Sequence, residues 1–289
     1  MTAAARPFAA VMGVGAWLPG FPDARALVEG VRRDDADAPP ARLPVRMRRR
    51  TSLLIRMVAE VAAQASEQSG ISLGTIPVVV GSAYGELGTT MEMLHEIAVD
   101  RGVSPFRFHN SVHNTASGYL SIAHENRCPA TSLAAGAQTA AMALLEARTL
   151  LEDRGGDVLV VVADETLPAA LTSAIATPVS AAVILRALPG SEGETSAAER
   201  ALGWLGDLRP EPLAPVGHAR PADPDAGPAR AFLRLVLAAL AARARPDAAP
   251  VRIDLTGPGE RPWAVTVGPP RPATMTAPRL EGAPTRQGP

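Results

Sequence analysis

Short apolar stretches alternate with helix-like stretches along this chain, and this alternation constrains the fold more than any other feature. Val158–Ala163 is apolar throughout, and Pro77–Val80 is a run of valines after a proline that ends at a glycine. Leu53–Ala65 carries an apolar stripe at helical spacing, and Ala140–Leu151 consists of strong helix formers. A strand that is apolar on both faces needs cover on both sides. The sequence therefore predicts an α/β fold with a mostly parallel sheet flanked by helices.

Other segments of the first 190 residues extend this pattern. Ala9–Val14 predicts a first strand that ends in a turn at Gly13-Val14-Gly15. Thr131–Ala135 and Thr177–Leu185 predict two further strands, and Thr89-Thr90 opens another helix. Ser52 or its neighbour Thr51 is placed to cap the helix that starts at residue 53.

The composition changes after about residue 189. Proline, glycine and charged residues dominate as far as Pro228, which predicts a long connection. An amphipathic helix containing Leu233–Leu240 follows, and Val251–Leu255 with Trp263–Val267 predicts a β-hairpin. We expect a main domain over residues 1–190, a Pro/Gly-rich connection over 191–228, a helix and β-hairpin over 229–268 that pack on the main domain, and a mobile tail over 269–289.

Charge and cysteine content exclude several classes of protein. The formal net charge is −1 and the pI is near 6.5, so no overall field favours nucleic acid or an anionic membrane. All 28 basic residues are arginines, which excludes lysine chemistry, and the single cysteine, Cys128, excludes an intramolecular disulfide framework. No apolar run approaches the roughly 20 residues of a membrane span. We expect a soluble cytoplasmic protein; a short secretory signal over Phe8–Leu18 is the less favoured alternative.

A dinucleotide site is one hypothesis for the first glycine turn. Gly13-Val14-Gly15 follows a predicted strand, and Asp34 and Asp35 lie about 20 residues further on. The third glycine of that fingerprint is absent, because Leu18 stands there. A tight turn at the end of a strand is the favoured interpretation.

Two histidines and two carboxylates raise other possibilities. His109 and His113 are four residues apart and would share one helix face, which is a zinc-ligand spacing, but a third ligand is missing. Hydrogen-bonded structural histidines are favoured, and we expect no metal or other cofactor. Asp164-Glu165 ends the most apolar strand, where ligands of α/β proteins bind, but capping of the next segment is favoured.

Serine chemistry and a basic cluster are the remaining motifs. Gly81-Ser82-Ala83-Tyr84-Gly85 has its serine in the wrong place for a hydrolase nucleophile elbow. An arginine cluster either receives an acidic partner, such as a carrier protein, or is a solvated face. This cluster consists of Arg46, Arg48, Arg49 and Arg50.

Phe108–Leu151 resembles the N-terminal half of a β-ketoacyl synthase. The best matching pieces are Asn114-x-x-x-Gly118 and Arg127-x-Pro129, and the likeness extends over roughly residues 8–187 in the family's order and spacing. The shortened branch of chain length factor-like proteins, associated with aryl polyene and related type II polyketide or fatty acid pathways, is the most similar. The resemblance implies one half of the thiolase-like fold.

The resemblance also implies that the catalytic groups of a condensing enzyme are missing. In the family, a nucleophilic cysteine lies eight residues after the proline of the Arg-x-Pro motif, at a strand-to-helix junction where its thiolate is favoured. Ala137 occupies that position, and its neighbours Gln138 and Thr139 are poor substitutes without an adjacent base. The family's two histidines belong to its C-terminal half, and residues 188–289 contain only His218.

A noncatalytic subunit is therefore the leading hypothesis. By resemblance, the chain pairs with a catalytic β-ketoacyl synthase as a heterodimer, meets the acyl carrier protein through that complex, and bounds the acyl tunnel. The implied tunnel and interface residues are Phe106, Phe108, His109, Val112, His113, Asn114, Gly118, Thr131 and Leu133. A free-standing enzyme that processes acyl thioesters with Gln138, Thr139 or His113 is the second hypothesis, and a nucleotide-binding module is the third.

Overall fold

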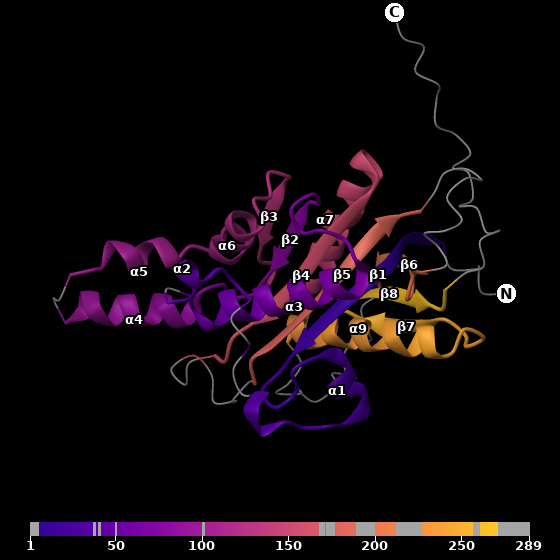
Figure 1. Cartoon of the computed structure of the whole chain (residues 1–289), viewed down its shortest axis with the longest axis horizontal. Coiled ribbons are helices and arrows are strands. Elements are labelled where there is room, and N and C mark those ends of the chain that lie inside the picture. Colours follow the sequence, from indigo (N-terminus) through magenta and orange to yellow (C-terminus); the bar gives the residue numbers. More distant parts are fainter. Residues whose placement is uncertain are drawn as a thin grey trace, which may run out of the picture.

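A computed structural model describes residues 6–36, 39, 42–49, 51–99, 102–167, 171, 177–188, 200–211, 227–256 and 261–270. In chain order the elements are β1 (Pro7–Trp17), α1 (Ala24–Glu29), the 3-10 helix η1 (Asp34–Ala36), α2 (Val45–Arg48), α3 (Leu53–Ser69), β2 (Val78–Gly81), α4 (Leu87–Ala98), α5 (Pro105–Asn110), α6 (Thr115–Ala123), β3 (Ala130–Leu133), η2 (Gly136–Gln138), α7 (Thr139–Arg154), β4 (Asp157–Asp164), β5 (Val179–Ala187), β6 (Gly203–Pro210), α9 (Pro228–Ala244), β7 (Val251–Asp254) and β8 (Trp263–Gly268). The predicted helices and strands are all present (Figure 1), with ends that differ by a few residues.

One sheet organises the described part of the chain, with the strand order β3-β2-β4-β5-β1-β6-β8-β7. The strand β2 is parallel to both β3 and β4, and the other five pairings are antiparallel. The prediction of an α/β sheet covered by helices is confirmed, but its mostly parallel character is wrong. Strands β4 and β5 are consecutive in the chain and pair antiparallel, and the C-terminal strands β6, β8 and β7 are also joined by antiparallel pairings.

Helices cover both faces of the sheet and produce two apolar cores. On one face α3 and α6 pack on the sheet, with Val80 and Val161 among the strand residues of that core. On the other face α7 and α9 pack on it, with Val79 and Val160 among the strand residues there. Because successive strand residues point to opposite faces, the uninterrupted apolar runs of β2 and β4 supply both cores.

Gly13 and Gly15 lie inside β1 and form no turn. The strand continues to Trp17, and both glycines pair with β5. A Cβ atom on Gly15 would overlap the carbonyl oxygen of Val61, and one on Gly13 would overlap that of Ala65. The predicted turn at the end of the strand is therefore wrong, because these glycines permit close packing of β1 against the backbone of α3.

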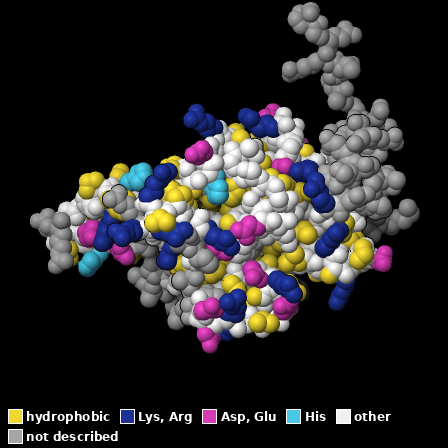
Figure 2. Space-filling model, viewed as in Figure 1, with side chains coloured by type: hydrophobic (Ala, Val, Ile, Leu, Met, Phe, Trp, Pro, Cys, Tyr) yellow, Lys and Arg dark blue, Asp and Glu magenta, His cyan; other side chains and the backbone are white. Residues whose placement is uncertain are grey.

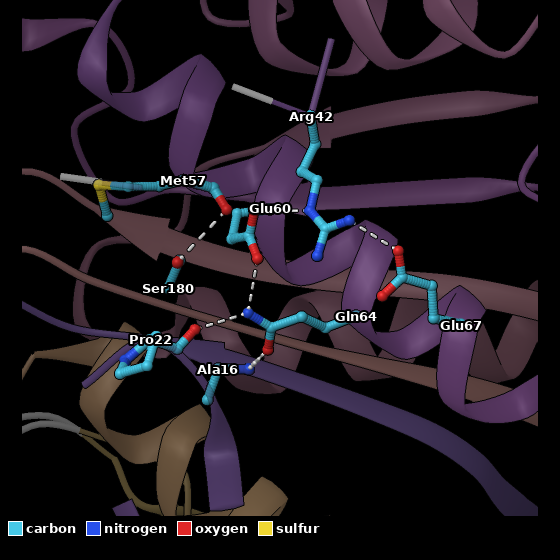
Figure 3. A network of polar contacts seen from close by, with 8 residues as sticks. All are labelled: Ala16, Pro22, Arg42, Met57, Glu60, Gln64, Glu67 and Ser180. Atoms are coloured by element: carbon cyan, nitrogen blue, oxygen red, sulfur yellow. Dashed lines mark hydrogen bonds and ion pairs between the residues drawn. The ribbon is translucent and has the colours of Figure 1, made fainter. Parts of the chain in front are cut away.

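A polar network fixes α3 to the chain around β1 (Figure 3). Gln64 accepts a hydrogen bond from the Ala16 amide at 3.0 Å and donates one to the Pro22 carbonyl at 2.8 Å. The Glu60 carboxylate, only 3% exposed, accepts from the Gln64 amide at 3.0 Å and pairs with Arg42 at 3.1 Å. The buried Glu60 and half-buried Gln64 side chains each have partners in this network, which offsets the desolvation cost of burying them.

The predicted connection over residues 191–228 contains a strand of the sheet. Gly203–Pro210 forms β6, which pairs with β1 on one side and β8 on the other. Helix α9 packs on the sheet and the hairpin β7–β8 extends it. The expected tail falls outside the described residues from residue 271 onward. No helix in the described ranges is both long and apolar enough to cross a membrane.

Candidate functional site

The parallel strands β2, β3 and β4 end at the same edge of the sheet, which is where α/β proteins commonly bind ligands. Four segments meet there. They are the turn after β2, the junction between β3 and α7, the end of β4 and the first turn of α3.

The junction between β3 and α7 is tight. Gly136 has φ +53°, and Gly136–Gln138 forms one turn of 3-10 helix before α7 begins at Thr139. The Thr139 hydroxyl accepts from the Ala135 amide at 3.0 Å and donates to the Gly136 carbonyl at 2.7 Å. The half-buried Ala137 lies in this turn, so at the position to which the resemblance assigned a cysteine the fold carries a methyl group.

Asp164 ends β4 within the protein interior. Its Oδ1 accepts hydrogen bonds from the Ala83 amide at 2.8 Å and the Ser82 hydroxyl at 3.1 Å. Its Oδ2 is buried without a hydrogen bond of normal geometry among the described residues, although the Ala229 amide at the start of α9 still favours the ionised form. Burial raises the pKa of Asp164 to about 6, against the effect of these donors.

Glu165 and Glu86 lie where α3 and α4 begin. The Glu165 Oε1 accepts from the Leu54 amide at 2.8 Å, and the Glu86 Oε1 accepts from the Ser52 hydroxyl at 2.9 Å. Burial raises the pKa of both carboxyl groups, for Glu86 to about 7. Glu165 therefore caps the start of α3, a helix more than 100 residues away in the chain, while much of the segment after it, which it was expected to cap, lies outside the described residues.

The two histidines do not share a helix face. His109 lies in α5, which ends at Asn110, and His113 lies in the turn before α6. The His113 Nε2 is 3.0 Å from the carbonyl oxygen of Ser82. Within the described residues, no cluster of three or more metal-ligating side chains occurs. The zinc spacing inferred from a continuous helix is therefore wrong.

The predicted tunnel and interface residues lie on two adjacent parts of the molecule. The side chains of Phe106, Phe108 and Val112 are 36%, 61% and 42% exposed. Asn114 and Gly118 belong to the start and middle of α6, and a Cβ on Gly118 would meet no atom within 4 Å. These residues are open to a partner, and their role in a tunnel stays a prediction.

Strand β3 forms one edge of the sheet and carries the other two predicted interface residues. Thr131 donates to Glu146 of α7 at 3.0 Å, and Leu133 is half-buried. The hydroxyls of Ser132 and Ser117 are 2.8 Å apart and join β3 to α6. Helix α6 continues this surface with Ile122, which is 61% exposed.

The arginine cluster lies on and just after α2. Arg46, Arg48 and Arg49 are exposed, and Arg50 lies outside the described residues. Arg48 also donates from Nε to the Leu43 carbonyl at 2.6 Å. Docking of an acidic partner on this cluster stays a prediction. Figure 2 shows basic side chains spread over this face of the molecule, with acidic and apolar side chains among them.

Residues 24–205, well over half of the chain, match the family described as β-ketoacyl synthase, N-terminal domain. The chain belongs to this family. No curated protein matches it in sequence.

Solved structures show the same fold at low sequence identity. One is a ketosynthase (ApeO) in complex with its chain length factor (ApeC) from Xenorhabdus doucetiae, at 19% identity and a TM-score of 0.64, covering 90% of this chain and 99% of that one. The ishigamide ketosynthase/chain length factor is 17% identical with a TM-score of 0.70, and the match covers 90% of this chain and 98% of that one. The complex of a type II polyketide acyl-carrier protein with its ketosynthase, AntDE:AntF, is 12% identical with a TM-score of 0.69, and the match covers 91% of this chain and 99% of that one. The predicted thiolase-like ketosynthase fold is thereby confirmed.

Glu86 is the site residue that the sequence did not single out. It follows the glycine turn Gly81–Gly85, which was considered only for its serine. The available signal was a single glutamate in a segment rich in glycine and apolar residues. A charged side chain in such a segment is either exposed or buried with a hydrogen-bonding partner. Its 2% exposure follows from where α3 begins, which only the three-dimensional structure shows.

Proposed function

We propose that this chain is a noncatalytic, chain length factor-like subunit that pairs with a catalytic β-ketoacyl synthase and shapes the cavity for the growing acyl chain. The observation that carries the proposal is Ala137. It lies at the tight turn between β3 and α7, in the position that the family's motif gives to the nucleophile. A methyl group forms no thioester, so a subunit of this kind contributes shape rather than chemistry.

Two of the side chains considered for a free-standing enzyme, Thr139 and His113, already make contacts in the described structure. The Thr139 hydroxyl is fully buried and is used in the backbone turn itself. The His113 Nε2 faces the carbonyl oxygen of Ser82. These contacts disfavour the alternative of a free-standing acyl-thioester enzyme that uses Thr139 or His113. They support a subunit in which the junction between β3 and α7 keeps a tight turn but carries no nucleophilic side chain at residue 137.

The exposed edge of the sheet supports pairing with another subunit. The open edge of β3 lies beside α6, and the exposed apolar side chains of Phe108, Val112 and Ile122 lie on α5, the following turn and α6. An unpaired strand edge with apolar neighbours is a surface that proteins normally cover. Three of the similar solved structures are described as complexes of a ketosynthase with a chain length factor or a carrier protein.

The nucleotide-binding alternative has lost its basis. The glycines that suggested it lie inside β1 against α3, so they form no loop that could surround a pyrophosphate. In the proposed function, the subunit limits the product by steric exclusion, because a packed cavity admits only an acyl chain that fits its length.

Coexpression with a ketosynthase encoded beside this chain tests the proposal. We expect a stable heterodimer on gel filtration, and condensation of acyl and malonyl groups on carrier protein only when both subunits are present. Ile122→Asp should weaken the complex at least tenfold. Val251→Asp, at the opposite edge of the sheet and 53% exposed, is the matched control and should not. Condensation by the purified chain alone would refute the noncatalytic role.

A further inference from the structure

Helices α4 and α5 extend away from the sheet as an arm (Figure 1). None of the residues of α4 is buried, and the helix packs mainly on α5. Arg107 of α5 pairs with Glu92 and Glu96 of α4 at 3.1 and 2.9 Å, which joins the two helices to each other. Because no residue of α4 is buried, the position of the arm depends on the contacts at the N-terminus of α4, where the arm joins the rest of the protein.

Glu86 lies at this point of attachment. It immediately precedes α4, and only 2% of it is exposed. Its Oε1 accepts a hydrogen bond from the hydroxyl of Ser52, which is the N-cap of α3 and accepts in turn from the Ile55 amide at 3.1 Å. Its Oε2 is 3.4 Å from the hydroxyl of Thr89 in the first turn of α4. One buried carboxyl group therefore connects the beginnings of two helices.

Glu165 enters the same junction from the end of β4. Its carboxylate accepts from the Leu54 amide of α3, and the Gly88 amide of α4 favours its ionised form as well. A Cβ atom on Gly88 would lie 3.3 Å from the Glu165 Oε2, which shows how closely this carboxylate approaches α4. The negative charge of Glu165 also acts directly on Glu86. The buried carboxyl group of Glu86 and the half-buried one of Glu165 thus share two helix N-termini.

The other charged groups around this junction compensate poorly for two negative charges. Arg56 on α3 favours the ionised form of Glu165, whereas Glu92 on α4 opposes it. Asp164 binds Ser82 and Ala83 in the turn before Glu86, and His113 packs on Gly85 of that turn. Two like charges at one junction disfavour each other, so a proton on Glu86 relieves the repulsion.

We propose that Glu86 and Glu165 form a proton-dependent hinge that fixes the arm to α3 while Glu86 is protonated and loosens it when both carboxyl groups are ionised. The hinge is a property of the chain by itself and does not depend on the proposed partner.

The direction of the pH dependence follows from the environment of Glu86. Burial raises its pKa to about 7, from an ordinary value of 4.5. The stabilisation by the bound proton is complete below the ordinary value and is lost as the pH rises through about 7. Between pH 6 and pH 8, opening of the arm should become about tenfold more favourable, because the closed form loses its proton over this interval.

Hydrogen exchange of the arm measures this change. We expect amides of α4, after correction for intrinsic exchange, to lose about tenfold in protection from pH 6 to pH 8 relative to amides of α7. Glu86→Gln, which is neutral at both pH values, should remove this difference. Glu152→Gln, an exposed carboxylate on α7, is the matched control and should keep it. Equal relative protection of the wild-type arm at both pH values would overturn the proposal.

A second measurement needs no substitution. In the wild-type protein labelled with 13C at glutamate carboxyl carbons, one resonance should titrate near pH 7, separate from the exposed glutamates. Titration of all glutamate carboxyls below pH 5.5 would refute the hinge even if Glu86→Gln does not fold. Failure to bind a ketosynthase would leave both readouts unchanged, so the two proposals fail separately.

Discussion

Replacing Gly15 with alanine should destabilise the protein strongly, because the added methyl group has no room. Its carbon would overlap the Val61 carbonyl oxygen and lie 2.9 and 3.0 Å from two other backbone atoms of Val61. A carbon and a carbonyl oxygen at rest are at least about 3.3 Å apart, so α3 would have to move by about 1 Å. Overpacking of this kind costs about 1–3 kcal/mol, and we expect the upper end because backbone rather than a flexible side chain must yield.

Urea denaturation of Gly15→Ala and of a matched variant tests this reasoning. Gly118→Ala places the same methyl group in helix α6 where no atom lies within 4 Å, so it should stabilise the isolated chain by about 0.5–1 kcal/mol. The same Gly→Ala change should then lower the free energy of unfolding at residue 15 and raise it at residue 118. A Gly15→Ala protein that unfolds at the wild-type urea concentration would show that β1 and α3 are not in close contact.

Four further substitutions test the fold and the candidate site. Asn126→Ala removes two hydrogen bonds to backbone carbonyls and one from the Cys128 amide, so thermal or urea unfolding should show a loss of about 2–4 kcal/mol. Thr139→Val leaves the Ala135 amide without its acceptor and should cost about 1–2 kcal/mol; a loss of acyl-thioester turnover instead would assign the hydroxyl a chemical role. Ala137→Cys should give no condensation by the chain alone, measured by mass spectrometry of carrier-bound products, since a thiol without a base and histidine partners is insufficient. Phe108→Ala, assayed with a cognate ketosynthase, should lengthen the product, and unchanged products would remove this side chain from the cavity wall.

Most of the strands and the longer helices were predictable because their signals are local. Val158–Ala163 could hardly be anything but a buried strand, and the structure extends it by one residue at either end as β4. Ser52 caps α3 as its residue type and place predicted. The direction of the strands was less accessible, because β4 and β5 are joined by a segment whose length permits either a hairpin-like or a crossover connection.

The errors in the sequence analysis arose where distant residues decide the outcome. Gly13 and Gly15 have the composition of a turn, but the approach of α3 explains them, and the residues that make that contact are about 50 positions away. The strand β6 was missed because Gly203–Pro210 contains glycine, charge and proline within a polar region; it forms because β1 offers an unpaired edge at Pro7–Val11. His109 and His113 were placed on one helix because no sequence signal marks the break after Asn110.

Asp164 and Glu165 show how the chemistry of this edge of the sheet differs from that of a ligand site. Helix N-termini at the carboxyl ends of parallel strands are favourable places for a bound anion, since their amides and dipoles point toward it. Here the amides of Leu54 and Ala83 are already occupied by the chain's own carboxylates. These internal anions occupy the N-terminus of α3 and the turn after β2, and they fix both segments to β4. The amides of Leu54 and Ala83 are therefore unavailable to an external anion at this edge.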